Sequence, residues 1–199
     1  IPFQRWYPYI EGYSPDFVKS LIDNYDLKSN KCIYDPFAGT GTTLFAADSF
    51  NIKTIFTEIN PLLQFLIQTK VKILQSNQAT RKKLSQRLIT ISGRIIDDLN
   101  KFEQDRYLKE SYSALFNSSK YFDDLVFEKI LRLRSFIDIV KLEDELLADI
   151  ITIAVLAGLI PVSLLKKAGD VRFKTKSELI KDNVDLSNFL SNKLLEMAE

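Results

Sequence analysis

A glycine turn between a short β-prone run and a helix-prone segment constrains this chain more than any other feature. Residues 35–43 read Asp-Pro-Phe-Ala-Gly-Thr-Gly-Thr-Thr. Gly39 and Gly41 allow the backbone to turn tightly and let a ligand lie against bare peptide groups. A helix that begins near Thr42 presents unpaired N–H groups in its first turn. A strand, a glycine turn and a helix in this order are typical of a nucleotide-binding turn.

Two short β-prone runs frame this turn. Lys31–Tyr34 and Lys53–Thr57 are predicted strands, and Thr42–Asp48 is the predicted helix between them. Asn60-Pro61 predicts the cap of a further helix. The order strand, helix, strand indicates one βαβ unit with parallel strands. Because two parallel strands make a poor sheet, we expect a missing part of the protein or a second chain to complete it.

The remainder of the chain has a helical pattern. Apolar residues recur at spacings of three and four in Leu84–Leu99 and in Phe127–Ile137, as in amphipathic helices. Leu146–Leu159 is apolar nearly all round and predicts a buried helix, ended by Gly158 and Pro161.

The C-terminal part is expected to hold a short basic segment and one last helix. The segment 170–174 is predicted to be irregular, and a helix is predicted from about Ser177 to Met197. The fold class is therefore α/β, with a βαβ part over residues 1–75 and a mostly α-helical region over residues 76–199.

The composition excludes several kinds of active site. The 199 residues include no His and one Cys, which excludes Ser-His-Asp triads, Cys-His pairs and His-ligated zinc, and no metal site is predicted. Cys32 lies in a predicted strand, where a small core residue is expected rather than a nucleophile. No run of about 18 apolar residues is found, so no membrane span is expected. Without a signal peptide or a pair of cysteines, we expect a cytoplasmic protein.

Glu58, at the end of the second predicted strand, narrows the ligand class. An acidic side chain at this place can hydrogen-bond the hydroxyls of a ribose. The turn is not a P-loop, because Gly-Lys-Ser/Thr is absent, and Leu44 stands where a dinucleotide fingerprint has its third glycine. The expected ligand is a nucleoside without a pyrophosphate, a description that S-adenosylmethionine (SAM) fits. A solvated acid at a strand end is the alternative for Glu58 alone.

The motif at residues 35–43 resembles the cofactor motif of amino-group DNA methyltransferases, which methylate adenine N6 or cytosine N4. Two flanking segments resemble the same family in order and spacing, Tyr7–Pro15 (Tyr-Pro-Tyr-Ile-Glu-Gly-Tyr-Ser-Pro) and Glu58–Pro61 (Glu-Ile-Asn-Pro). The resemblance covers roughly residues 6–75. It implies a partial Rossmann-like SAM methyltransferase fold.

By this resemblance, the cofactor-binding residues fall into three groups. Tyr13, Ser14 and Pro15 would close over the methionine end of SAM, and Glu58 would bind the ribose with Asn60 beside it. The glycine turn would line the methionine moiety through Asp35, Pro36, Phe37, Ala38, Gly39, Gly41, Thr42 and Thr43. An ordinary glycine turn and an aromatic-rich docking segment are the structural alternatives.

The catalytic motif of that family is missing. The family uses Asp/Asn/Ser-Pro-Pro-Tyr/Phe/Trp, which accepts hydrogen bonds from the target amino group and stacks on the flipped base. All six prolines here are isolated, at positions 2, 8, 15, 36, 61 and 161. No catalytic residue is therefore expected in this chain, and we expect it to be inactive alone.

The resemblance implies a role in a larger assembly. We interpret the chain as the cofactor-binding fragment or subunit of a DNA methyltransferase, belonging to a restriction-modification system and acting on double-stranded DNA. A second polypeptide or a missing C-terminal part would carry the catalytic motif. An RNA base methyltransferase and a non-catalytic SAM-binding or regulatory subunit are the alternatives.

The helical region has two open interpretations. It is a scaffold that docks the missing part, or it contacts DNA phosphates through basic residues interleaved with Phe173. The candidate phosphate contacts are Lys166, Lys167, Arg172, Lys174 and Lys176. A solvated loop is the alternative for the same charges.

Overall fold

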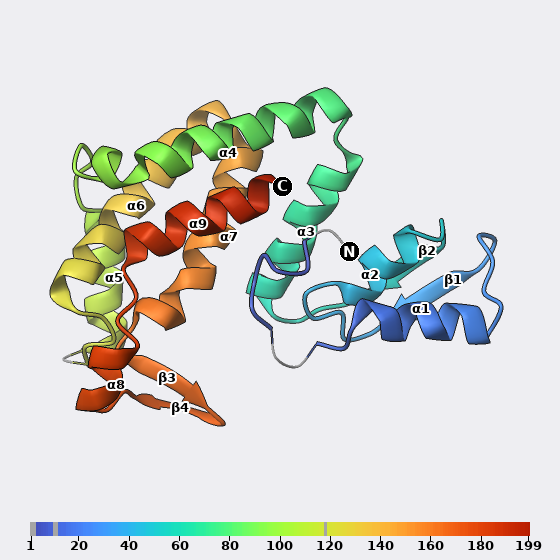
Figure 1. The fold of residues 1–199 in the computed structure, drawn as a ribbon, viewed down its shortest axis with the longest axis horizontal. Helices are drawn as coiled ribbons and strands as arrows, with labels where there is room; N and C mark the ends of the chain where they lie inside the picture. Colours follow the sequence, from blue (N-terminus) through green and yellow to red (C-terminus); the bar gives the residue numbers. More distant parts are fainter. Residues whose placement is uncertain (1–2, 10–11, 118) are drawn as a thin grey trace. The chain divides into compact units, whose positions relative to one another are not determined.

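The computed structural model describes residues 3–9, 12–117 and 119–199, except for the side chain of residue 96. Ile10 and Glu11 of the predicted Tyr7–Pro15 segment lie outside the described residues. The chain divides into two compact units, residues 1–76 and residues 77–199. Figure 1 colours the first unit blue to teal and the second green to red.

Unit 1 is built on a two-stranded parallel sheet. Its strands pair from Cys32 opposite Lys53 to Asp35 opposite Phe56. The helix between the strands starts directly after the glycine turn, which confirms the predicted βαβ order. The elements of unit 1 are α1 (Pro15–Asn24), β1 (Cys32–Asp35), α2 (Thr42–Asp48), β2 (Lys53–Phe56) and α3 (Pro61–Gln75).

One face of this sheet is covered by helices. α1 and α2 pack against each other, and Ile33 of β1 lies against the buried cluster that they form. The members of that cluster are Val18, Ile22, Ala46, Ala47 and Ile52. Burial of a Val or Ile side chain contributes about 1.5–3 kcal/mol, so this layer holds α1 and α2 on the sheet.

The opposite face of the sheet is exposed. Side chains alternate between the two faces of a strand, so Cys32, Tyr34 and Ile55 share one side of the parallel register. Tyr34 is 60% exposed, Ile55 is 53% exposed, and Cys32 is exposed as well. The prediction that Cys32 is a core residue is wrong, because it lies on this uncovered face. Parallel sheets are ordinarily covered on both faces.

Unit 2 is organised around α7, which packs against α6 and α9, while α4 lies along α9. Most residues of α7 are buried, among them Leu147, Ile151 and Ile153. α4 and α6 confirm the amphipathic helices predicted at Leu84–Leu99 and Phe127–Ile137. The elements of unit 2 are α4 (Gln78–Leu99), α5 (Arg106–Phe116), α6 (Asp124–Glu143), α7 (Glu145–Val162), β3 (Leu165–Ala168), β4 (Asp170–Phe173), α8 (Lys176–Lys181) and α9 (Leu186–Ala198).

Short polar residues begin every described helix except α2. In each case a side-chain oxygen accepts a backbone N–H from the first turn, which satisfies a donor that the helix leaves unpaired. These N-cap residues are Ser14, Asn60, Asn77, Asp105, Asp123, Asp144, Thr175 and Asp185. The N-cap of α2 is Gly41, which has no side chain to offer. Among the described helices, α2 is therefore the one whose N-cap side chain accepts no N–H group of the first turn.

α7 has the length and composition of a membrane-spanning helix, yet it is mostly buried inside unit 2. Its 18 residues have a mean hydropathy of 2.1, and 61% of them are buried. The expectation that the chain holds no apolar stretch of this length is wrong. The mean hydropathy of the helix stays high although it contains the two acidic residues Glu145 and Asp149. A helix that is apolar all round is typical of a core surrounded by other helices.

Gly158 does not end α7, contrary to the prediction. A Cβ at this position would lie 2.9 Å from two ring carbons of Phe189 on α9. Gly158 therefore lets α7 and α9 approach closely. The helix continues through Pro161, which lies in the last turn, and ends at Val162.

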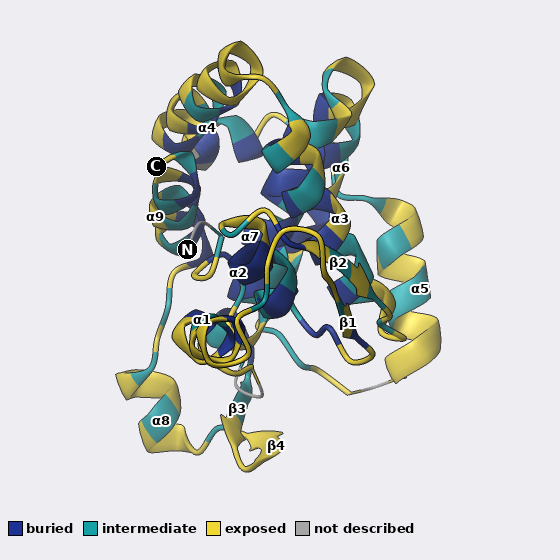
Figure 2. Cartoon of the chain, turned by 90° about the vertical axis from the view of Figure 1, so that its right-hand side faces the viewer, coloured by how far each residue is buried: buried dark blue, intermediate teal, exposed yellow. Residues whose placement is uncertain are grey.

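The basic segment after α7 is an antiparallel hairpin, not an irregular loop. β3 and β4 pair from Leu165 opposite Phe173 to Ala168 opposite Asp170, and Gly169 makes the turn with a φ of +82°. All residues of β4 are exposed, so no buried face produces the alternating pattern by which a strand is predicted. Figure 2 shows β4 in the yellow of exposed residues.

The predicted C-terminal helix is in fact two helices, α8 and α9. The side chain of Asp185 accepts the N–H of Asn188 at 2.9 Å and begins a new helix there. Asp and Asn favour such local side-chain bonds over the middle of a helix, and residues 182–185 read Asp-Asn-Val-Asp.

Candidate functional site

The carboxylate of Asp35 organises the end of β1. The side chain is 8% exposed, and its Oδ1 accepts the N–H of Phe37 at 3.1 Å. Its Oδ2 accepts the hydroxyls of Tyr13 at 2.8 Å and Thr43 at 2.5 Å. One buried carboxylate therefore joins the start of the glycine turn, the segment before α1 and the first turn of α2.

Tyr13, Ser14 and Pro15 have separate roles in this arrangement. The hydroxyl of Tyr13 contacts Thr43 Oγ1 as well as Asp35, and burial raises the pKa of Tyr13 above its ordinary value. Ser14 caps α1 by accepting the N–H of Phe17 at 3.2 Å, and Pro15 is the first residue of that helix. The structure thus brings Tyr13 to the glycine turn, while Ser14 and Pro15 fix where α1 begins.

The glycine turn has two left-handed residues. Gly39 has a φ of +56° and Gly41 a φ of +89°, values that side-chain-bearing residues rarely adopt. The N–H of Gly41 donates to the carbonyl of Ala38 at 2.8 Å, which closes the turn. A Cβ on Gly41 would lie 2.8 Å from the ring of Phe45, so no side chain fits there.

Glu58 follows β2 and binds the turn that follows β1. Its Oε2 accepts the N–H of Gly39 at 2.8 Å, and its Oε1 accepts the N–H of Asn60 at 2.8 Å. A carboxylate has about four acceptor positions, so each oxygen retains one for a further donor. Asn60 itself caps α3 by accepting the N–H of Leu62 at 2.9 Å. Glu58 is therefore held in place and can still accept the two hydroxyls of a ribose.

Two large apolar side chains, one in the glycine turn and one directly after Glu58, are exposed. Phe37 in the glycine turn is 85% exposed, and Ile59 is 94% exposed. A flat apolar ring such as a purine would gain by covering such surfaces. Ile59 was not among the predicted cofactor-binding residues. Ile59 directly follows Glu58 in a segment with no predicted strand or helix, and this position could have indicated an exposed residue near the ligand.

A pocket of about 350 Å³ lies between α1 and β1. Its polar lining is the cluster of Tyr13, Asp35 and Thr43, and apolar side chains of α1 such as Phe17 and Leu21 form much of the rest. This volume lies in the range of small-molecule sites.

Comparison with known proteins finds relatives of a segment of this chain. Type II methyltransferase M.AvaI, from Nostoc sp. (strain PCC 7120) and from Anabaena variabilis, is 43% identical over 74 residues, 37% of this chain and 15% of the relative. Type II methyltransferase M.BsoBI of Geobacillus stearothermophilus is 34% identical over 73 residues, 37% of this chain and 14% of the relative. The homologues of this segment are Type II methyltransferases. The resemblance to methyltransferases that the glycine motif predicts is confirmed.

The match to Type II methyltransferases spans about one seventh of the length of those relatives. No family model matches the chain, and no solved structure matches it. The comparison therefore identifies the relatives of part of the chain and does not extend to their full length.

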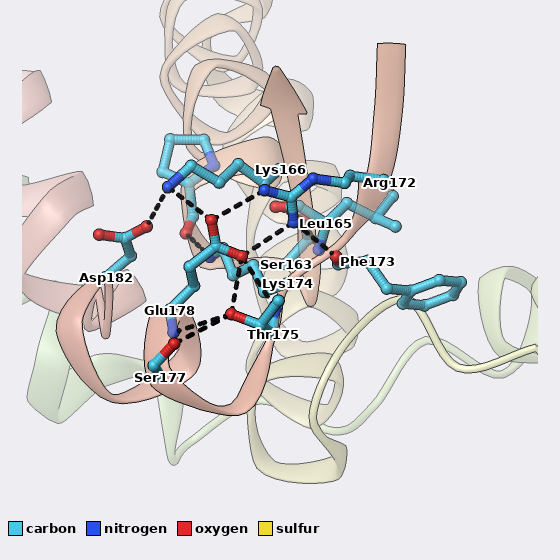
Figure 3. Close-up of polar contacts among 11 residues, drawn as sticks. Ser163, Leu165, Lys166, Arg172, Phe173, Lys174, Thr175, Ser177, Glu178 and Asp182 are labelled. Carbon is cyan, nitrogen blue, oxygen red and sulfur yellow. Dashed lines mark hydrogen bonds and ion pairs between the residues drawn. The ribbon is translucent and has the colours of Figure 1, made fainter. Parts of the chain in front are cut away.

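The five basic residues predicted to contact phosphates lie in and around the β3–β4 hairpin and not in the glycine turn. Two of them, Lys166 and Arg172, form ion pairs (Figure 3). Arg172 donates to Glu178 through two nitrogens, at 2.8 and 2.9 Å, and Lys166 lies 3.1 Å from the same carboxylate. Lys166 also donates to Asp182 at 3.0 Å. These bonds hold the pKa of Glu178 far below its usual range, chiefly because Arg172 donates to it. Lys166 and Arg172 therefore fix the hairpin on α8.

The other three basic residues differ in their contacts. Lys174 donates to the carbonyl of Pro161 at 3.0 Å and so satisfies an acceptor at the end of α7. Lys167 and Lys176 are exposed. Of the five, these two are the ones whose ammonium groups have no hydrogen bond or ion pair among the described residues.

Proposed function

We propose that this chain is the SAM-binding part of a DNA methyltransferase that modifies an exocyclic amino group, adenine N6 or cytosine N4. It is a fragment or a subunit, it belongs to a restriction-modification system, and unit 1 is part of a Rossmann-like methyltransferase fold. The catalytic tetrapeptide comes from a second polypeptide or a further part of the same protein. Methyltransferase homologues of a 74-residue segment support the class of reaction.

The carboxylate of Glu58 is the observation that carries the cofactor assignment. It lies where β2 ends, it is bonded to the glycine turn through Gly39, and it retains acceptor capacity for ribose hydroxyls. The exposed side chains of Phe37, in the glycine turn, and of Ile59, directly after Glu58, suit an adenine ring. Gly39 and Gly41 adopt the left-handed conformations that shape the turn along which the methionine moiety would lie.

SAM, when bound, supplies a methyl group on a sulfonium, and the residues of this chain bind and orient it. Asp35 holds the turn, with Tyr13 and Thr43 bonded to the same carboxylate. A direct displacement by an amino group needs positioning and no covalent enzyme intermediate. A site built from fixed hydrogen bonds, without a nucleophile, is consistent with that reaction.

The uncovered face of the sheet supports the need for a further polypeptide. Tyr34 and Ile55 expose apolar surface on a two-stranded parallel sheet, an arrangement that parallel sheets in complete proteins avoid. The segment that completes the sheet would also bring the missing tetrapeptide. For the DNA partner, we propose phosphate contacts at Lys167 and Lys176, the exposed members of the basic set, with Lys166, Arg172 and Lys174 supporting the hairpin.

Calorimetric titration with SAM tests the cofactor assignment. We expect saturable binding to the wild-type chain, weakened about tenfold or more by Glu58→Ala, since each hydrogen bond to a charged group contributes about 1.5–3 kcal/mol. Asp23→Ala, which removes an exposed carboxylate of unit 1, is the matched control and should leave the affinity unchanged. Equal affinities of the Glu58→Ala and Asp23→Ala chains would contradict the assignment.

Transfer of a labelled methyl group to double-stranded DNA tests the reaction. The chain alone is expected to be inactive, and a mixture with a polypeptide that carries the tetrapeptide is expected to be active. A non-catalytic SAM-binding subunit is the second candidate, favoured by the absence of any Pro-Pro pair. Saturable SAM binding with inactivity in every mixture would support that second function.

A further inference from the structure

Lys70 of α3 lies buried beneath the glycine turn. Its side chain is 3% exposed, and its Nζ donates to the carbonyl of Thr40 at 3.0 Å. The same ammonium lies 5.4 Å from the centroid of the Phe45 ring, within the range of a cation–π contact. Within the described part of the chain, it forms no ion pair with a carboxylate.

A cation in this position is costly for folding. Burial of an ammonium group without a counter-ion disfavours its charged form, and burial lowers the pKa of Lys70 to about 8. An apolar side chain of similar length would fill the same space without that cost. Core packing therefore does not explain a lysine here, and its contact with the turn is the remaining observation.

The contact adds a second restraint to the peptide group that joins Thr40 to Gly41. Thr40 stands between Gly39 and Gly41, and glycines accept both signs of φ, so the glycines themselves impose little restraint on the peptide planes around Thr40. Glu58 holds the N–H of Gly39, and the carbonyl of Ala38 holds the N–H of Gly41. The carbonyl of Thr40 belongs to the same peptide group as the N–H of Gly41, so Lys70 and Ala38 restrain that group at its two ends.

We propose that Lys70 is a positioning residue for the cofactor, which acts through the carbonyl of Thr40 to keep the glycine turn in its binding conformation. It does not touch the ligand. This inference rests on the proposed function, in that the ligand of the turn is SAM. The buried ammonium of Lys70 lowers the stability of unit 1, and in return it holds the glycine turn in one conformation.

The variant Lys70→Met tests this role, with Lys72→Met as its control, an exposed lysine on the same helix. We expect Lys70→Met to weaken SAM binding about tenfold or more, since small misplacements at a binding site are costly. Amide hydrogen exchange at residues 37–43, measured without SAM, should quicken about tenfold in the same variant. The thermal midpoint should not fall, which separates loss of positioning from loss of the fold.

A measurement on the wild-type chain keeps the inference testable if Lys70→Met does not fold. Lysine acetylation followed by mass spectrometry should show slower labelling of Lys70, relative to Lys72, when SAM is bound, because SAM would hold the turn closed over Lys70. Unchanged affinity and unchanged exchange in Lys70→Met, or no protection of Lys70 by SAM, would overturn the inference. Failure of the wild-type chain to bind SAM would instead overturn the proposed function, and the exchange comparison would still decide the role of Lys70.

Discussion

Gly39 and Glu58 are joined by a hydrogen bond of 2.8 Å, in which the backbone N–H of the turn donates to the carboxylate that follows β2. The bond connects the ends of two parallel strands at the edge of the sheet where α/β proteins bind ligands. Glu58 thus has a structural role in addition to the ribose-binding role that we propose for it. Its removal should affect stability even without a cofactor.

We expect Glu58→Ala to lower the free energy of unfolding by about 1–3 kcal/mol, because the N–H groups of Gly39 and Asn60 both lose their acceptor. Urea denaturation at an unchanged slope would measure the loss. The control Asp23→Ala should stay within about 0.5 kcal/mol of the wild type. Indistinguishable stabilities of the two variants would show that Glu58 does not anchor the turn.

The Tyr13 hydroxyl gives a second prediction. Tyr13→Phe removes a donor to Asp35, and we expect a loss of about 1–2 kcal/mol in the free energy of unfolding. Thr43→Val removes the other hydroxyl on the same oxygen of Asp35. Because the two hydroxyls share one acceptor and contact each other, the double variant should depart from the sum of the single losses by at least about 0.5 kcal/mol. Strict additivity would mean that the three side chains do not act as one cluster.

The buried ammonium of Lys70 predicts a pH dependence of stability. Its pKa is about 8 in the folded chain and 10.5 when unperturbed, so the unfolded chain binds more protons between these values. The free energy of unfolding should therefore rise with pH from about 8 towards 10.5, by up to about 3 kcal/mol. Lys70→Met should lack this rise, and the difference between the two stability curves isolates it from other titrating groups. Parallel curves for the two chains would refute the expectation.

Gly158 and Gly93 form a matched pair of helical glycines in unit 2. Gly158→Ala places a Cβ 2.9 Å from the ring of Phe189, and we expect a loss of about 1–3 kcal/mol in the free energy of unfolding. Gly93→Ala, on α4, meets nothing within 4 Å and should gain about 0.5–1 kcal/mol from helix propensity. Thermal unfolding of both variants gives the comparison. A stabilised Gly158→Ala chain would show that α7 and α9 do not approach as closely as described.

Exposed lysines of the hairpin region predict a change in the salt dependence of DNA binding. If Lys167 and Lys176 each neutralise one phosphate, the double alanine variant should reduce the slope of log affinity against log salt by about 2. Lys82→Ala with Lys83→Ala, exposed on α4, removes the same charge and should leave the slope unchanged. Equal slopes for all three chains would place the DNA contact elsewhere.

The βαβ part of the fold could be predicted because its signals are local. Asp35-Pro36 ends a strand, Gly41 opens a helix, and Asn60-Pro61 caps another, and each signal acts within a few residues of the chain. The same locality made Asp35 and Glu58 predictable as candidates. Asp35 ends β1 and Glu58 follows β2, and the parallel pairing of these strands brings the two ends to the same edge of the sheet.

Features that depend on distant contacts could not be predicted. Gly158 was interpreted as a helix end, since its partner Phe189 lies 31 positions further along the chain. In the sequence, Lys70 looks like an ordinary exposed position of a helix, and only the structure shows that it donates to the carbonyl of Thr40. The hairpin escaped prediction because Lys166 and Arg172 are satisfied by Glu178 of a separate helix and not by a buried face.

The uncovered face of the β1–β2 sheet has a consequence for the order in which the protein folds and assembles. α1, β1, α2 and β2 are adjacent in the chain and can pack against each other as soon as they leave the ribosome, whereas Tyr34 and Ile55 would remain exposed to water until the polypeptide that we propose as the completion of the sheet binds. During that interval the chain carries an apolar surface and free strand edges, which favour self-association. If the proposal is right, production of the chain together with the completing polypeptide should raise its yield, because the apolar surface is then exposed to other copies for a shorter time.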